Sequence, residues 1–250
     1  MDAPLALPPE LMEAGRVHVF DPACQCAPDQ PAFTGVRVYR DALTAEETEG
    51  LLREIEAAPF VPSQSGKHKQ HFGPRFNFTR RRMNADRFGG LPDYAHALEA
   101  RLRECVGRDA VGDPADLEDC RTALADFETT DAFVLRYLER EESNLDFHVD
   151  DLFAYGEAIV DVSLDSDSVL TFLGPASASG SAEHPVCVRV PLPARSIAVV
   201  HGRARFDWQH AILAGDIRGV RTSITLRTLG GALRATDAGR QVLLRSRPRS

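Results

Sequence analysis

A His-x-Asp pair, His148 and Asp150, and a distant second histidine, His210, are the residues of this chain best suited to carry chemistry. Side chains two residues apart on an extended strand point to the same side, so His148 and Asp150 would face one space. Two imidazoles and one carboxylate occupy one face of a non-haem Fe(II) ion and leave its other face open. The pattern therefore predicts an oxygen-activating iron site with His148, Asp150 and His210 as its catalytic metal ligands.

Two other histidines compete with His210 for the third ligand position. His184 lies in a loop rich in Ser, Ala and Gly, whereas His201 follows an apolar run and is typical of a turn residue. A lone His-x-Asp pair is most often an ordinary pair of surface residues. We favour His210 because two arginines follow it and because Trp208, two residues before it, would point into the same space.

Arg221 and Arg227 are six residues apart on a segment typical of a strand, and this even spacing predicts that both face the same side. Guanidinium groups on the inner face of an apolar barrel are costly without anions. A dicarboxylate such as 2-oxoglutarate would satisfy both, because Arg binds carboxylates in bidentate fashion. The alternative is a salt bridge to a core acid, above all for Arg227. Tyr137 lies on the strand entering this space, where its hydroxyl either donates to the co-substrate or is satisfied within the core.

The elements that must position these residues are mostly short strands. From Ala132 onward, apolar runs separated by Gly, Pro, Asp and Ser dominate the sequence, which is typical of a β-sandwich or barrel. The predicted strands are residues 36–39, 133–138, 159–164, 169–173, 186–190, 197–200 and 223–226. Together with helices near the N-terminus, they predict a mainly β (α+β) fold, a jelly roll with N-terminal bracing helices.

The first predicted helix begins at Thr44, which forms a capping box with Glu47, and ends before Pro59. A second helix is predicted over residues 92–105 from its apolar stripe. Residues 107–130 are rich in Asp and predict an irregular excursion on the surface.

The chain of 250 residues carries a formal net charge of −8, which predicts weak general binding to nucleic acid unless a local basic patch overrides the mean. Five cysteines without a Cys-x-x-Cys pair predict reduced thiols of an intracellular protein of the cytoplasm, the nucleus or both. Cys24 and Cys26 are expected to be an incidental pair. No apolar run is long enough to span a membrane, and no secretory signal is recognised at the N-terminus.

One stretch of this acidic chain is strongly basic. Its cationic residues are Lys67, Lys69, Arg75, Arg80, Arg81, Arg82 and Arg87. Such a stripe suits the phosphates of nucleic acid or an acidic protein surface, and a solvated face is the plain alternative. Phe72, Phe76 and Phe78 alternate through the same stretch, where they would stack a base, cage a methylammonium or simply cover the mouth of the barrel.

In this order, the His-x-Asp pair, the distal histidine and the strand from Arg221 to Arg227 resemble the AlkB family of Fe(II)/2-oxoglutarate-dependent dioxygenases. Residues 63–78, with their Ser-Gln-Ser-Gly and Lys-Gln-x-x-Gly-Pro motifs, are similar to the substrate lid of AlkB homologues. Residues 191–196 (Pro-Leu-Pro-Ala-Arg-Ser) and 208–212 (Trp-Gln-His-Ala-Ile) look most like the fourth animal homologue subgroup. The resemblance covers roughly residues 33–229.

The resemblance implies a double-stranded β-helix in which His148, Asp150 and His210 ligate iron. It also implies that Arg221 and Arg227 hold the two ends of 2-oxoglutarate with the help of Tyr137. The substrate-lid residues that it implies are Lys69, Gln70, Phe72 and Arg75. The chain is thereby divided into an extended or partly disordered segment (1–31), a dioxygenase domain (32–229, with a lid at about 61–90) and a C-terminal tail (230–250).

The implied reaction is oxidative removal of an N-methyl group with Fe(II), 2-oxoglutarate and O2, which releases formaldehyde and succinate. The net negative charge favours methylated lysine in protein as the substrate, and N-methylated bases such as N6-methyladenine in nucleic acid are the alternative. A non-catalytic metal-binding jelly-roll scaffold is the alternative of another class. Two departures stand out, since only Cys24 and Cys26 remain of a cysteine-rich N-terminal segment and Leu135 replaces an Asn that assists co-substrate binding in some members.

Overall fold

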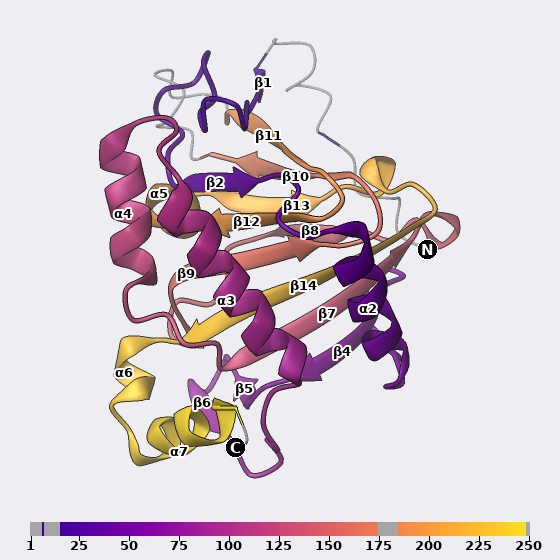
Figure 1. Cartoon of the computed structure of the whole chain (residues 1–250), viewed down its shortest axis with the longest axis vertical. Coiled ribbons are helices and arrows are strands. Elements are labelled where there is room, and N and C mark those ends of the chain that lie inside the picture. The colour runs from indigo at the N-terminus through magenta and orange to yellow at the C-terminus, as the bar shows by residue number, and fades with distance from the viewer. Residues whose placement is uncertain (1–6, 8–15, 175–184, 249–250) are drawn as a thin grey trace.

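Two sheets stacked face to face form the centre of the molecule (Figure 1). The computed structural model describes residues 7, 16–174 and 185–248. Among these residues, the larger sheet has seven strands in the order β2-β12-β9-β14-β7-β4-β3, all paired antiparallel. The smaller sheet has five described strands in the order β1-β11-β10-β13-β8, and β1 runs parallel to β11.

Seven of the strands overlap the apolar runs predicted from the sequence, and the other described strands were not predicted. The larger sheet comprises β2 (Val36–Tyr39), β3 (Val61–Pro62), β4 (His68–Phe72), β7 (Asp131–Leu138), β9 (Tyr155–Ser163), β12 (Ser196–Val200) and β14 (Val220–Leu229). The smaller sheet comprises β1 (Val17–Val19), β8 (Leu145–His148), β10 (Ser168–Leu173), β11 (Cys187–Leu192) and β13 (Gln209–Ile212). A separate hairpin is made by β5 (Arg75–Asn77) and β6 (Arg82–Asn84). The predicted mainly β jelly roll with bracing helices is confirmed.

Strict alternation along β7 and β14 sorts their side chains between two cores. Val134 of β7 and Ile224 of β14 belong to the apolar cluster under the helices. Leu135 and Tyr137 belong to the cluster between the two sheets, which also contains Trp208. The larger sheet is therefore apolar on both faces, and its inner face is the one that can carry a site.

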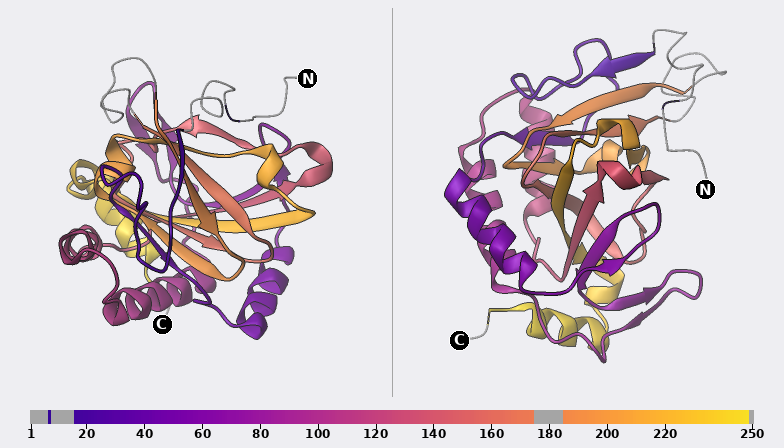
Figure 2. Two further views of the ribbon diagram at one scale, coloured as in Figure 1. Left: turned by 90° about the horizontal axis from the view of Figure 1, so that it is seen from above. Right: turned by 90° about the vertical axis from the view of Figure 1, so that its right-hand side faces the viewer.

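Three helices cover the outer face of the larger sheet (Figures 1 and 2). They are α2 (Ala45–Glu56), α3 (Asp93–Arg108) and α4 (Pro114–Leu124). The predicted capping box of α2 is confirmed, because the Glu47 amide donates to Thr44 Oγ1 (3.1 Å) and the Thr44 amide donates to Glu47 Oε2 (2.7 Å). Across the described part of the chain, none of the helices combines the length and apolar character needed to cross a bilayer.

The prediction of an irregular excursion over residues 107–130 is wrong, because α4 occupies its middle. The Asp113 side chain caps this helix and Pro114 takes the first helical position, where its missing N–H costs nothing. Leu117, Cys120 and Leu124 are the buried stripe of α4. Acidic residues lie between these three positions, so the composition of the segment suggests a loop although its apolar residues recur with helical spacing.

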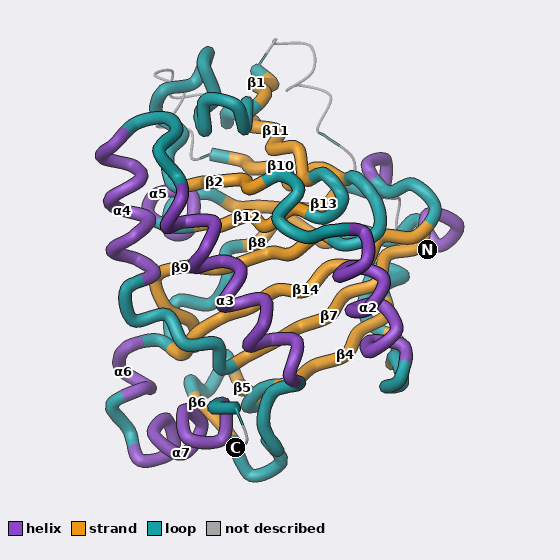
Figure 3. Tube along the Cα trace, viewed as in Figure 1, coloured by secondary structure: helices purple, strands orange, loops and turns teal. Residues whose placement is uncertain are grey.

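The segment predicted to be a C-terminal tail instead begins with two short helices, α6 (Gly231–Arg234) and α7 (Asp237–Ser246). Leu233 and Val242 pack in a small apolar cluster with Phe88, and Met83 of the β5–β6 hairpin packs against it. The C-terminal helices therefore lie beside this hairpin, as the tube trace shows (Figure 3).

The described part of the N-terminal segment also packs on the fold. β1 extends the smaller sheet, and Phe20, which follows it, is buried between the sheets. A disulfide joins Cys24 and Cys26, which corrects the expectation of five reduced thiols, whereas the three other cysteines are free.

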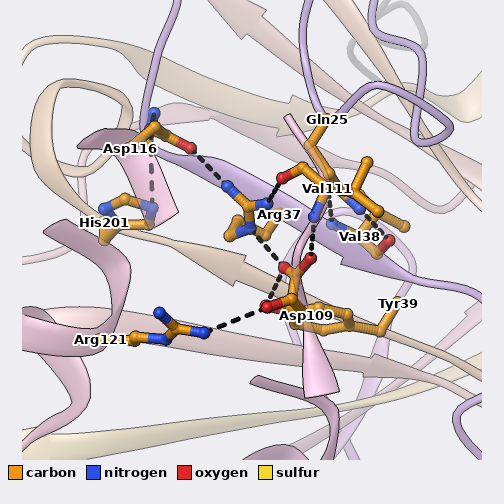
Figure 4. A network of polar contacts seen from close by, with 10 residues as sticks. Gln25, Arg37, Val38, Tyr39, Asp109, Val111, Asp116, Arg121 and His201 are labelled. Carbon is orange, nitrogen blue, oxygen red and sulfur yellow. Dashed lines mark hydrogen bonds and ion pairs between the residues drawn. The ribbon is translucent and has the colours of Figure 1, made fainter. Parts of the chain in front are cut away.

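A buried polar network fixes the connection between α3 and α4 to the edge of the larger sheet (Figure 4). Arg37 on β2 is fully buried, and its guanidinium pairs with Asp109 (2.7 Å) and Asp116 (2.9 Å). Tyr39 donates its hydroxyl proton to the same Asp109 carboxylate (3.0 Å). Because both acids surround the buried guanidinium, its charge is compensated and the network acts as a rigid brace.

Candidate active site

The three predicted metal ligands lie together at one end of the smaller sheet. His148 ends β8 and is directly paired with His210 on β13, and their ring centroids are 4.3 Å apart. Asp150 follows two residues after His148, and its Oδ2 lies 3.5 Å from His210 Nε2. One ligand atom from each residue can be chosen so that all three lie within 4.8 Å of one another. The geometry therefore brings together the residues that the sequence selected.

The donor set fits an Fe(II) ion. Asp150 Oδ2 and His210 Nδ1 are buried and have no hydrogen-bond partner within the described chain. A buried polar atom without a partner costs free energy, and an ion held at this point would supply Asp150 Oδ2 with one. His148 Nδ1 lies 2.8 Å from the Asp146 carbonyl, a contact that fixes its ring and leaves Nε2 for a metal.

The electrostatics of the site favour the protonation states that metal ligands need. Burial lowers the pKa of His148, and the neighbouring His210 lowers it further. Burial would by itself raise the pKa of Asp150, but the charge of Arg227 and the contact with His210 outweigh it and hold this pKa well below its usual range. At neutral pH the carboxyl is therefore ionised and the His148 imidazole is neutral.

Arg227 is committed to two carboxylates, as in the alternative that the sequence left open. Its Nε donates to Asp150 Oδ1 (2.9 Å), and its NH1 lies 3.5 Å from Asp131 Oδ1. The guanidinium also lies over the Tyr155 ring, 4.9 Å from its centroid. Arg227 thus occupies one oxygen of Asp150 and leaves the other for a metal.

Arg221 lies further along the same inner face. Its NH2 donates to Asp161 Oδ2 (3.0 Å) and Ser163 Oγ (3.1 Å), and its NH1 donates to Ser223 Oγ (3.0 Å). Its guanidinium lies 5.1 Å from the centroid of the Tyr137 ring. Burial raises the pKa of the Tyr137 hydroxyl, so that it stays protonated and can donate to a carboxylate. The two residues that would hold a co-substrate carboxylate are therefore neighbours.

A single cavity of about 560 Å³ connects the triad with these residues. Its lining includes all six predicted metal and co-substrate residues, and Leu135, Leu170 and Ile212 contribute apolar walls. Ser63, Gln64, Lys67 and Phe78 of the segment that resembles a lid also line it, and so do four residues that the sequence did not indicate, namely Asp146, Asp151, Tyr155 and Asp161.

The predicted lid residues lie outside this cavity. Gln70 is buried, and its amide donates to the carbonyls of Ile55 and Ala58 at the end of α2 (both 2.8 Å). Phe72 packs edge-on against Tyr94 of α3. Alternation on β4 explains both positions, because residues opposite Val134 and Ala132 must face the helices.

All four predicted lid residues line a second cavity of about 620 Å³. Lys69, Arg75, Arg87 and His71 contribute its basic side chains. Lys69 Nζ lies 5.9 Å above the ring of Phe133, which lines the first cavity. Lys69 is therefore adjacent to the first cavity without lining its interior.

The competing histidines are separated from the triad or lie outside the described residues. His201 is buried in the network of Figure 4, with its Nε2 3.9 Å from Asp116 Oδ1. His184 lies outside the described residues. Trp208 is buried between the sheets beside Phe33 and Phe172, and it packs the core rather than lining the cavity as expected.

Lys67 is a buried ammonium on the cavity wall. Burial lowers its pKa to about 8, although the charge of Asp146 opposes this shift. Because the unfolded chain keeps this lysine protonated up to the ordinary lysine pKa of 10.5, unfolding takes up a proton between these values. Stability relative to a Lys67→Met variant should therefore rise as the pH rises from about 8 to 10.5. Urea unfolding of both proteins at three pH values would test this, and a difference independent of pH would contradict it.

Comparison with known proteins gives relatives in sequence and in fold, although no family model matches the chain. A Caenorhabditis elegans protein named DNA N6-methyl adenine demethylase is 29% identical over 193 residues, which cover 77% of this chain and 59% of that protein. The human alpha-ketoglutarate-dependent dioxygenase alkB homolog 4 is 29% identical over 238 residues, which cover 84% of this chain and 74% of that protein. The solved structure of OsALKBH1 matches with a TM-score of 0.54 and 12% identity over 78% of this chain and 97% of that one.

The chain spans less than two thirds of the worm protein and about three quarters of the human one. The OsALKBH1 structure supports the fold alone. The two sequence relatives agree with the predicted resemblance to the AlkB family.

Proposed function

We propose that this chain, an AlkB-like Fe(II)- and 2-oxoglutarate-dependent dioxygenase, removes N-methyl groups from its substrate by oxidative demethylation. The observation that carries this proposal is the placement of the His148, Asp150 and His210 donor set in one cavity with Arg221 and Tyr137. When bound, iron supplies the redox chemistry by which O2 and 2-oxoglutarate oxidise a methyl group.

The residues of the chain bind, orient and exclude water. His148, Asp150 and His210 hold the ion, and Arg227 keeps the Asp150 carboxylate turned towards it. Arg221 and Tyr137 would hold the far carboxylate of 2-oxoglutarate, since a guanidinium and a protonated phenol are both donors. The apolar walls beside them keep the cavity dry and strengthen these charge-assisted contacts.

The mouth of the cavity favours an N-methylated base in nucleic acid as the substrate. Phe78 lines the cavity and is 51% exposed, and its ring stacks on Phe76 with centroids 5.9 Å apart. Phe76 in turn meets Tyr155 edge-on at 5.5 Å. Stacking platforms of this kind suit a base that has left its duplex or strand.

Basic side chains surround this platform. The exposed cations of the hairpin region are Arg75, Arg80, Arg81, Arg82 and Arg87. These arginines make the hairpin region basic although the whole chain has a net charge of −8. Such a region suits a phosphate backbone next to the stacked base. A relative named as an N6-methyladenine demethylase of DNA adds support to this choice over the protein substrate that the net charge favoured.

Methylated lysine in protein is the second candidate because two carboxylates also line the cavity. Asp146 and Asp151 lie on its wall together with the rings of Phe133 and Tyr155. An aromatic wall next to carboxylates suits a methylammonium group, which is a cation. Both substrates carry their methyl group on nitrogen, so they share the reaction.

The experiment that tests the function compares N6-methyladenine oligonucleotides with methyl-lysine peptides at equal concentration. We expect formaldehyde from the oligonucleotide, and we expect Arg80→Glu/Arg82→Glu to raise its KM at least about tenfold, with a weaker dependence on salt. The matched control is Arg53→Glu/Glu49→Arg on the exposed face of α2, which should leave KM unchanged. Formaldehyde from the peptide alone would assign the protein substrate instead.

Residues 32–229 are proposed as the dioxygenase domain, with the described terminal segments packed against it. An intracellular location stays a proposal that rests on the free thiols of Cys105, Cys120 and Cys187.

A further inference from the structure

Asp131 lies next to Arg227 and contacts His71, and neither His71 nor Asp131 lines the cavity of the metal site. Asp131 opens β7, and its carboxylate is almost wholly buried, with 1% of the side chain exposed. Its Oδ2 lies 2.6 Å from His71 Nε2, and its Oδ1 lies 3.5 Å from Arg227 NH1. Arg227 then reaches Asp150 Oδ1 at 2.9 Å. These contacts form a continuous chain from His71 on β4 to a metal ligand.

The sheet register builds this chain. Asp131 and Arg227 are direct cross-strand partners on β7 and β14, so their side chains leave the sheet next to each other on one face. His71 pairs with Phe133 on the neighbouring strand, which places its ring one step away from Asp131 on the same face. The contact of Arg227 with Asp131 is therefore a consequence of strand pairing and not of a mobile surface rotamer.

The space for the pair depends on a glycine. A Cβ on Gly73 would lie 2.3 Å from Asp131 Oδ2 and 3.0 Å from His71 Nε2. The backbone of Gly73 does not need the left-handed region, so conformational freedom does not explain this residue. Room for the His71–Asp131 contact does explain it.

Two carboxylates on either side of Arg227 restrict it more than one would. If the Arg227 guanidinium were bound to Asp150 alone, the two side chains could change rotamer together, and the Asp150 carboxylate could turn. Asp131, itself held by His71, forms a second ion pair with Arg227 NH1 at 3.5 Å, which opposes this movement. Asp150 Oδ1 then stays occupied, and Oδ2 remains its free oxygen.

We propose that His71 and Asp131 form a positioning pair that holds Arg227 so that Asp150 presents only Oδ2 to the metal. The proposal rests on the iron site proposed above, and it assigns roles to residues that touch neither metal nor co-substrate. Removing a group that contacts a metal ligand directly changes metal affinity by about 10- to 100-fold. Asp131 acts through Arg227, so its removal should have a smaller effect.

The test measures binding of Co(II), a spectroscopic substitute for Fe(II), to the full chain by titration calorimetry and by visible absorption. We expect Asp131→Asn to weaken Co(II) binding by several-fold, up to about tenfold, and to change the absorption band, because Asp150 becomes free to offer both oxygens. His71→Ala should do the same to a smaller extent. His71→Gln should restore most of the affinity, since its amide can still donate to Asp131. Gly73→Ala should weaken binding without altering either partner.

The controls separate this proposal from general loss of structure. His68→Gln, on the same strand and 3.8 Å from Glu141, should leave Co(II) affinity unchanged. Asp161→Asn, the corresponding acid beside Arg221, should change 2-oxoglutarate affinity but not Co(II) affinity. Wild-type affinity and spectrum in folded Asp131→Asn and His71→Ala would overturn the positioning pair, and so would equal losses in His71→Ala and His71→Gln. Wild-type Co(II) affinity in His210→Ala would instead overturn the metal site itself.

Discussion

Replacing His148, Asp150 or His210 by alanine is expected to remove turnover while the fold is retained. Each change deletes one of the three donors that converge within 4.8 Å, and no other described His, Cys, Asp or Glu joins this cluster. Because loss of an outer partner alone costs about 10- to 100-fold, loss of a ligand should lower metal affinity by more than about 100-fold. Calorimetric titration with Co(II) and assay of succinate release would measure the two effects.

The matched control for this prediction is His201→Ala. His201 is buried, but it lies in the network beside Asp116 and does not line the cavity that holds the triad. Its loss should lower the free energy of unfolding and leave metal affinity unchanged. Turnover that survives in any of the three ligand variants, or metal affinity that falls with His201→Ala, would refute the assignment.

The second large effect is a contrast between the two arginines of β14. Arg221→Ala should raise the KM for 2-oxoglutarate about 10- to 100-fold, since it removes a charge-assisted hydrogen bond worth about 1.5–3 kcal/mol. Metal affinity should change little, because Arg221 pairs with Asp161 and two serines and not with a ligand.

Arg227→Ala should act on the metal and on stability instead. It leaves Asp150 and Asp131 as buried carboxylates without their shared cation, which costs about 3–5 kcal/mol. Metal affinity should fall with it, so that added 2-oxoglutarate does not rescue turnover. Titrations of 2-oxoglutarate and of Co(II) with both variants would check the contrast, and equal effects on both ligands in the two variants would contradict it.

The sequence predicts the site correctly where residues on the same strand are concerned, because their relative orientation follows from their spacing. Strand alternation alone places His148 with Asp150 and Arg221 with Arg227, and both placements agree with the structure. The partners of the arginines come from strands far away in the sequence, and spacing says nothing about them. One signal was nevertheless present, since Asp161 interrupts an otherwise apolar run and a lone acid on a buried strand needs a cation.

The lid shows the opposite case. Gln70 and Phe72 belong to the motif that resembles a substrate lid, but β4 is paired in the larger sheet and directs both side chains to the helices. The parts of this region that reach the cavity are Ser63, Gln64 and Lys67 near the start of the segment and Phe78 at its end, on the turn of a separate hairpin. Strand register, which depends on tertiary pairing, decided which residues of the segment face the site.

The measurement that tests the central claim most directly is succinate release from purified protein with Fe(II), ascorbate, 2-oxoglutarate and O2. With an N6-methyladenine oligonucleotide present, the structure predicts succinate and formaldehyde in equal amounts, and Asp150→Ala should yield neither. Succinate without formaldehyde from either substrate class would retain the dioxygenase and reject both proposed substrates. No succinate from folded, metal-loaded protein would contradict the enzyme and favour a metal-binding scaffold.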